Sequence, residues 1–171
     1  MSYDTPNYQI IEKEGQFEIR LYEPYTIAKV AVERDVKTGS MGFTRIFNYI
    51  SGNNSKKEQI AMTAPVFNWD KEMKYYTAFV MPRKYNDKSL PLPDDSGIKI
   101  EKVPSKKMAA YRFSGIVSQQ NVSKNEDALF RWLKEKNYEI LSESRLARYN
   151  SPYSIPVLRR NEILFEVTEK K

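Results

Sequence analysis

The sequence predicts an α+β fold built from two similar β-rich halves, each with one packed α-helix. Segments with the two-residue alternation of strands occur in both halves, whereas only two segments have the apolar spacing of an amphipathic helix. These two segments begin near residues 39 and 124, so about half of the 171-residue chain separates them. The repeated order of strands, helix and further strands predicts a duplication, although the halves share no obvious sequence identity.

The N-terminal part of the chain has strand patterns. Residues 8–11 form a short apolar run. Phe17, Ile19 and Leu21 then alternate with more polar neighbours, which is the pattern of a half-buried strand. Residues 27–32 are rich in β-branched side chains and predict a third strand.

The period then changes to that of a helix. Four apolar side chains recur at a spacing that places them on one helical face. They are Phe43, Ile46, Phe47 and Ile50. Thr38 or Ser40 is placed to cap the start of this helix, and Gly52 is placed to end it. Such a stripe normally faces the core, so burial is the ordinary expectation for these side chains.

Strand patterns return after the helix. Residues 60–67 are apolar but contain Pro65, which we expect at a strand start, an edge or a bulge. Residues 75–81 predict a further strand. Residues 82–97 are rich in turn-forming side chains, and we interpret them as a connection inside one domain spanning residues 1–171. The two halves would then cover about residues 8–82 and 98–168.

The second half repeats this order. Ser123 and Glu126 have the spacing of a capping box, which predicts the start of the second helix. Leu129, Trp132 and Leu133 form its apolar face, and Asn137 can adopt the left-handed conformation that ends it. The predicted strands of this half are residues 98–103, 107–117, part of 138–149, and 161–168.

The composition excludes several classes of site. The chain has no cysteine and no histidine, so it has no disulfide, thiolate or imidazole ligand, and no Ser-His-Asp triad. The net charge of +6 favours anionic partners, although the basic residues are spread along the chain as on an ordinary solvated surface. No apolar run is long enough for a membrane span, and residues 1–8 do not resemble a signal peptide. We therefore expect a cytoplasmic protein.

Several local strings occur in the order found in a known family. They are Tyr22-x-Pro24, Gly42-Phe43, Tyr49-Ile50-x-Gly52-x-Asn54, Ile60-Ala61-Met62-Thr63-Ala64-Pro65-Val66, Val80-Met81-Pro82, Leu90-Pro91-x-Pro93, Arg112-Phe113-Ser114-Gly115 and Arg159-Arg160-Asn161-Glu162. Together they resemble the SOUL haem-binding protein family, over roughly residues 8–168. The resemblance implies a twisted antiparallel β-barrel of two pseudo-symmetric halves. It also implies kinship with the GyrI-like small-molecule-binding fold, in which ligands lie in a cleft between the halves.

The resemblance also implies a tetrapyrrole site. Relatives bind the ring on an apolar patch made partly by the first helix, which here carries Phe43, Ile46, Phe47 and Ile50, and some add a rim that corresponds to residues 149–160. Arg45, Arg159 and Arg160 are candidates to hold the propionates, and Met62 and Tyr149 are candidate contacts to the ring or its iron. This sequence departs from the family where one branch uses a histidine ligand, and it has Asn48 where another branch has a lysine.

Each candidate also has a structural interpretation. Arg159 and Arg160 are as well suited to a structural ion pair with Glu162 or another carboxylate as to a ligand. For Arg45 a solvated side chain is the simpler interpretation, and for Met62 it is ordinary packing in the apolar segment.

The function predicted is therefore a binding module for haem, another tetrapyrrole or another hydrophobic anionic ligand, without chemistry. The alternative is a GyrI-like binder or hydrolase, with Glu162 or Glu18 as a base whose pKa burial would raise. Residues 75–79 loosely suggest a sheet that faces RNA, but they lack the accompanying glycine-rich string, so we expect no nucleic acid partner.

Overall fold

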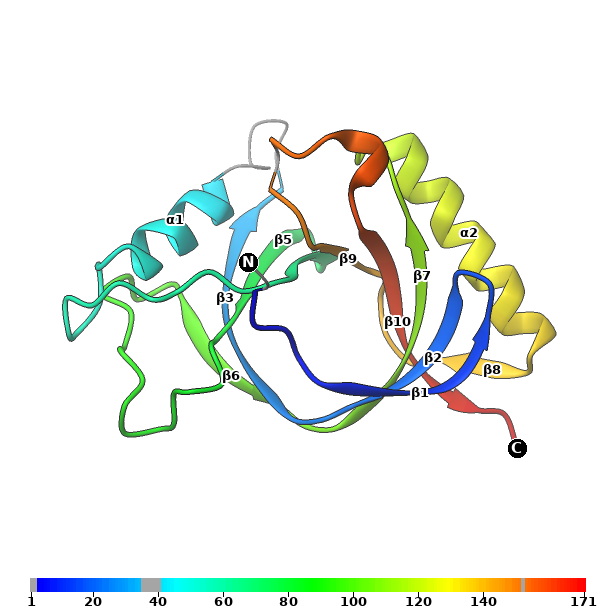
Figure 1. The fold of residues 1–171 in the computed structure, drawn as a ribbon, viewed down its shortest axis with the longest axis horizontal. Helices are drawn as coiled ribbons and strands as arrows, with labels where there is room; N and C mark the ends of the chain where they lie inside the picture. Colours follow the sequence, from blue (N-terminus) through cyan, green and yellow to red (C-terminus); the bar gives the residue numbers. More distant parts are fainter. Residues whose placement is uncertain (1–2, 35–40, 152) are drawn as a thin grey trace. The chain divides into compact units, whose positions relative to one another are not determined.

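The computed structural model describes residues 3–34, 41–151 and 153–171. The chain forms two compact units, each an antiparallel sheet with one α-helix, and this confirms the predicted α+β class (Figure 1). The units interleave along the chain: unit 1 comprises residues 1–6 and 24–104, and unit 2 comprises residues 7–23 and 105–171. The sequence had predicted contiguous halves. Strand pairing separates them differently, because the first two strands pair in unit 2 and the strand at 99–103 pairs in unit 1.

The described residues of unit 1 form four strands and one helix. Its strands lie in the order β4, β5, β3, β6, and helix α1 packs against β3 and β5. The bounds are β3 (Tyr25–Glu33), α1 (Met41–Ile50), β4 (Val66–Lys71), β5 (Lys74–Val80) and β6 (Lys99–Val103). The core between helix and sheet consists of Ala28, Val30, Ile46, Tyr49, Ile50, Ile60, Phe79, Met81 and Ile98.

Local signals in the sequence explain the ends of these elements. Gly52 N–H donates to the Tyr49 carbonyl and Asn53 N–H to that of Asn48, which is the Schellman arrangement expected after α1. Gly52 has φ of +128°, where a glycine is favoured. Pro65 immediately precedes β4, in agreement with the strand-start prediction, and residues 60–64 are not in a strand. Thr38 and Ser40 lie outside the described residues.

In unit 2, the part of the chain that the structure describes forms six strands and one α-helix. The order is β1, β2, β7, β10, β9, and β8 pairs with the C-terminal end of β10. The bounds are β1 (Tyr8–Glu14), β2 (Phe17–Tyr22), β7 (Lys106–Phe113), α2 (Gln119–Glu135), β8 (Tyr138–Ile140), β9 (Arg145–Arg148), η2, a short 3₁₀ turn (Pro156–Leu158), and β10 (Asn161–Glu169). The core under α2 contains Ile19, Ala109, Leu129, Trp132, Leu133, Ile163 and Val167.

The predicted start of the second helix is wrong by about one turn. Helix α2 begins at Gln119, and the Ser118 hydroxyl caps it by accepting from Asn121 N–H at 3.1 Å. Glu126, the expected partner in a capping box, instead accepts from the Ser144 hydroxyl. The predicted end is confirmed, because Asn137 has φ of +63° and follows the last turn.

Strand β2 also differs from its pattern. The alternation predicted one buried and one solvated face, yet Arg20 and Tyr22 are buried while Leu21 is exposed. The apolar side chain Ile19 faces the α2 core, and the polar side chains on the other face are buried in contacts of their own. Among the described residues, no helix is both long and apolar enough to cross a bilayer.

Candidate functional site

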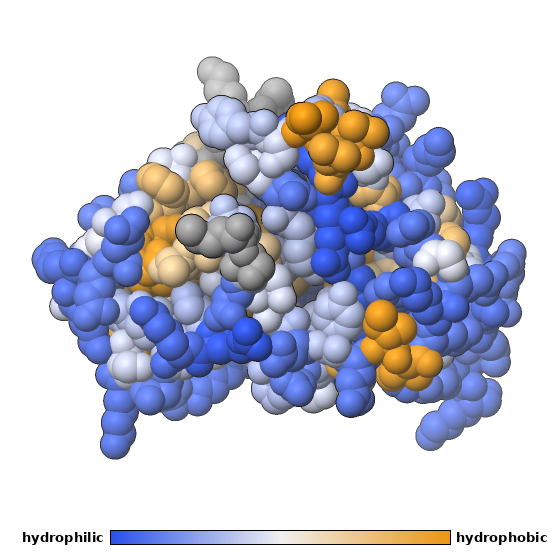
Figure 2. Space-filling view, in the orientation of Figure 1, coloured by the Kyte–Doolittle hydropathy of each residue, from blue (hydrophilic) through white to orange (hydrophobic). Residues whose placement is uncertain are grey.

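Helix α1 presents both core and surface side chains. Ile46, Ile50 and Tyr49 are buried in the core of unit 1. Phe43 and Phe47, one turn apart, remain 38% and 51% exposed, and their rings stack with centroids 6.3 Å apart. Apolar colours gather over α1 in the space-filling view (Figure 2). The predicted stripe therefore divides into a buried aliphatic half and an exposed aromatic pair, Phe43 and Phe47.

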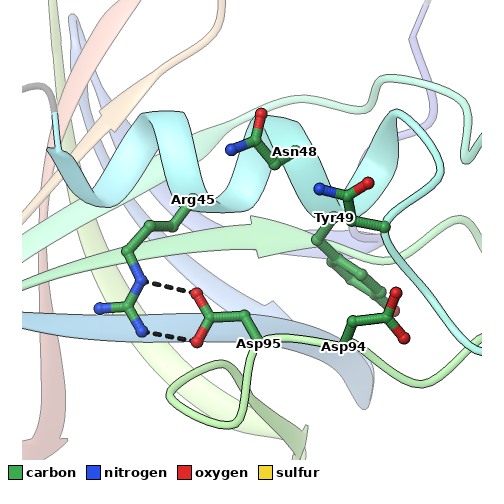
Figure 3. Close-up of a pocket in the computed structure, with 6 residues that line it drawn as sticks. Arg45, Asn48, Tyr49, Asp94 and Asp95 are labelled. Carbon is green, nitrogen blue, oxygen red and sulfur yellow. Dashed lines mark hydrogen bonds and ion pairs between the residues drawn. The ribbon is translucent and has the colours of Figure 1, made fainter.

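A polar hollow of about 290 Å³ adjoins the same helix. It is lined by Arg45, Asn48, Tyr49, Asn53, Asp94 and Asp95 (Figure 3). Arg45 donates from Nε and Nη2 to the two Asp95 oxygens, each at 2.7 Å. This hydrogen bonding lowers the pKa of Asp95 and raises that of Arg45. Arg45 is therefore held in one orientation instead of lying free in solvent, with its Nη1 outside the ion pair.

The partner of Arg45 was not predicted. Asp95 lies 50 residues away in the long connection, and the only local signal is the turn-forming string that ends in Gly97. A side chain at Gly97 would place its Cβ in steric conflict with Arg45 Nη2, so the absence of one gives the guanidinium room. Met62 lies before β4 in unit 1, and its side chain is 38% exposed. The thioether is therefore only partly packed against the protein.

The remaining predicted site residues belong to unit 2. The Arg160 guanidinium lies 4.0 Å from the centre of the Tyr149 ring, and it donates to Glu162 and to the Tyr8 hydroxyl. Arg159 donates from Nε to the Ser154 carbonyl at 3.0 Å. Of the two roles that the sequence allowed for Arg160, a contact to a ligand or an ion pair with Glu162, the structure has the ion pair.

A buried ion pair that the sequence did not predict lies at the centre of this group. Arg20 donates from Nη1 and Nη2 to the two oxygens of Glu162, at 2.8 and 2.7 Å, and both side chains are buried. Arg20 also donates to the Tyr22 hydroxyl and to Glu18. The alternation of β2 predicts that Arg20 faces solvent, so the strand pattern gave no sign of this ion pair. The string Arg159-Arg160-Asn161-Glu162 was the one sequence signal for this part of unit 2.

Burial and neighbouring charges determine the protonation states of Glu162 and Tyr149 in this cluster. Burial alone would raise the pKa of Glu162, but the hydrogen bonds and charges of Arg20 and Arg160 outweigh burial and lower it. Burial raises the pKa of Tyr149 well above its usual value, so its phenol is neutral at pH 7. The expectation that Glu162 is a general base with a raised pKa is therefore wrong, because the two guanidiniums stabilise its charged form.

Comparison with known protein families shows the family of this chain. The model of the family described as SOUL heme-binding protein matches residues 3–166. The chain belongs to the SOUL heme-binding protein family. No curated protein matches the sequence.

Solved structures share the fold of this SOUL family member at low identity. The EcmrR C-terminal domain has a TM-score of 0.67 at 12% identity, over 95% of this chain and 99% of that one. A hydrolase from Listeria innocua has a TM-score of 0.64 at 9% identity, over 92% and 94%. SAV2435 bound to tetraphenylphosphonium has a TM-score of 0.51 at 10% identity, over 95% and 94%. These likenesses support the GyrI-like fold, and family membership supports small-molecule binding in general.

The side chains of this SOUL protein suit a ring held without a strong iron ligand. The sequence offers no histidine or cysteine, and the described residues contain no cluster of three or more acidic side chains placed to hold a metal ion. Tyr49 is buried, its hydroxyl donates to the Pro91 carbonyl at 2.6 Å, and burial raises its pKa to about 12. The aromatic pair, in contrast, offers a planar macrocycle the apolar surface that it needs.

Proposed function

We propose that this protein binds haem or a related tetrapyrrole non-covalently, through the aromatic pair on α1 and without a histidine ligand. The observation that carries the proposal is the exposure of the stacked pair Phe43 and Phe47 on a helix whose Ile46, Tyr49 and Ile50 are buried; Met41, at the start of the helix, is exposed as well. Ile46 and Ile50 are buried in the core of unit 1 and so hold in place the helix that carries the pair. When bound, haem would supply its iron chemistry, and the protein would supply an apolar surface and a cation.

Arg45 is the cation that this proposal assigns to a propionate. Asp95 engages its Nε and Nη2, and Nη1 lies outside that ion pair, at a side chain that is one-third exposed. Because Asp95 partly neutralises the guanidinium, we expect a contribution of about 1 kcal/mol or less to affinity. Met62 is assigned an apolar contact, and Tyr149 and Arg160 are assigned a structural role in unit 2.

A comparison of haem with iron-free protoporphyrin IX tests the proposal. If the ring is held by apolar contact, the two compounds should bind with the same affinity within about threefold, which is less than 1 kcal/mol. Absorbance titration measures haem binding, and porphyrin fluorescence measures binding of the iron-free compound. Failure of both to bind at micromolar concentration, or haem binding more than about a hundredfold tighter than the iron-free ring, would contradict the proposed mode.

The hydrolase alternative receives no support from Glu162. Both of its oxygens accept from guanidinium nitrogens, and its lowered pKa makes it a weak base. A protein that binds a ligand without chemistry is therefore the function that the geometry favours.

A further inference from the structure

The segment between β9 and β10 carries a dense group of exposed apolar side chains. Tyr153, Ile155, Val157 and Leu158 are between 62 and 96% exposed, although they lie within six consecutive residues around η2. Ile116 is also exposed, and its neighbour Gly115 donates its N–H to the Pro156 carbonyl at 2.8 Å. Figure 2 shows a compact orange cluster where Figure 1 places η2. We call these five side chains the η2 patch.

Hydrogen bonds hold the η2 patch in a defined shape. Leu158 N–H donates to the Ile155 carbonyl at 3.0 Å, and Arg159 N–H donates to the Pro156 carbonyl at 3.1 Å. Within the same loop, Arg159 Nε donates to the Ser154 carbonyl. The bond from Gly115 N–H to the Pro156 carbonyl links the loop to the segment after β7. The apolar side chains are thus presented on a preformed loop. Large contiguous apolar surface of this kind usually marks an interaction site.

The surroundings of the η2 patch are basic. Arg112 and Arg148 lie at the ends of β7 and β9, beside the start of β10, and Arg159 and Arg160 directly follow η2. The acidic side chain at this end of β10, Glu162, is buried and already paired with Arg20 and Arg160. The whole chain carries a net charge of +6. The apolar loop is therefore flanked by the exposed Arg112 and the partly exposed Arg159, whereas Arg160 is paired with Glu162 and the Nε of Arg148 is buried.

We propose that the η2 patch docks this protein onto an anionic lipid surface. Apolar side chains that reach the acyl boundary, with arginines at the level of the phosphates, are the combination by which peripheral proteins bind such surfaces. Positive charge around the patch complements the negative charge of the lipid, which favours a membrane over a neutral apolar protein groove. The η2 patch belongs to unit 2 and the aromatic pair of α1 to unit 1, and the two share no residue, so the test of docking needs no bound ligand.

Vesicle sedimentation tests the proposal with two matched double variants. V157S/L158S removes two side chains of the η2 patch, and L92S/L141S removes two exposed apolar side chains elsewhere. On phosphatidylcholine vesicles with about 30% phosphatidylglycerol, we expect V157S/L158S to lower the partition coefficient at least tenfold and L92S/L141S to change it less than about twofold. Pure phosphatidylcholine or about 0.5 M salt should also weaken binding of the unmodified protein.

Three results would overturn the proposal. The first is no binding of the unmodified protein to anionic vesicles, and the second is equal binding by V157S/L158S. The third is a dimer in gel filtration that V157S/L158S converts to a monomer, because the patch would then be an interface between copies. A single L158W variant gives an independent readout: anionic vesicles, but not neutral ones, should shift its tryptophan emission to the blue by more than that of the unmodified protein, which contains Trp69 and Trp132.

Discussion

Replacement of Glu162 by glutamine should strongly destabilise unit 2. Glu162 accepts four N–H groups, two from Arg20 and two from Arg160, at 2.7 to 3.1 Å. Glutamine keeps the shape but removes the charge, and its amide nitrogen cannot accept from a guanidinium. Arg20 would then stay buried with Glu18 as its one remaining acidic partner among the described residues.

The magnitude follows from the burial of this pair. Breaking one side of a buried ion pair costs about 3 to 5 kcal/mol, against a total stability of about 10 kcal/mol for a chain of this length. With a urea dependence of about 2 kcal/mol per molar, the midpoint should fall by about 2 M. Glu166→Gln is the matched control, because Glu166 lies on the same strand in a half-exposed ion pair with Lys106, and it should cost about 1 kcal/mol or less.

Urea unfolding monitored by Trp132 fluorescence is the assay. Trp132 packs against Phe17 in unit 2, and a Trp69→Phe background in all variants removes the signal of unit 1. A loss below about 1 kcal/mol for Glu162→Gln, equal to the control, would refute the reasoning. The pH dependence gives a second check. Because the folded state lowers the pKa of Glu162 below its ordinary 4.5, this stabilisation is present above pH 4.5 and is lost as pH falls through the folded pKa. The difference between the unmodified protein and Glu162→Gln should therefore shrink in acid.

Two further predictions concern the helices. Gly42→Ala should destabilise the protein by about 1 to 2 kcal/mol in chemical unfolding despite a better helix propensity, because the added Cβ would lie 2.7 Å from the buried Thr77 hydroxyl; an unchanged or higher stability would contradict the close approach of α1 to β5. Ser118→Ala should cost about 1 kcal/mol by the same measurement, whereas Ser123→Ala should cost nearly nothing; the reverse order would restore the capping box that the structure contradicts.

Local signals predicted the parts of the fold that local interactions determine. The apolar spacing of α1 and α2, the glycine after α1 and Asn137 after α2 each act within one turn of a helix, so the sequence showed them directly. The start of α2 was missed because the spacing of Ser123 and Glu126 matches a capping box, whereas Ser118 accepts from Asn121 N–H and the Asn121 side chain donates to the Ile116 carbonyl at the actual start.

The ion pairs and the burial pattern that the sequence did not predict depend on contacts between residues far apart in the chain. Arg20 and Glu162 are 142 residues apart, and nothing local reveals that a charged position in an alternating strand is buried. The Arg45–Asp95 pair has the same origin. For the α1 face, periodicity correctly placed four side chains together, but only the packing of α1 on β3 and β5 decides that two are buried and two exposed.

The most direct test of tetrapyrrole binding at α1 compares two phenylalanines of equal exposure. Phe47 on α1 is 51% exposed and Phe130 on α2 is 53% exposed. Truncation of Phe47 removes about 100 Å² of apolar contact, worth up to about 2.5 kcal/mol, so Phe47→Ala should weaken protoporphyrin IX binding at least tenfold in a fluorescence titration. Phe130→Ala should leave the affinity unchanged. Equal affinities for Phe47→Ala and the unmodified protein, with both folded by circular dichroism, would place the ligand elsewhere and contradict the proposed site.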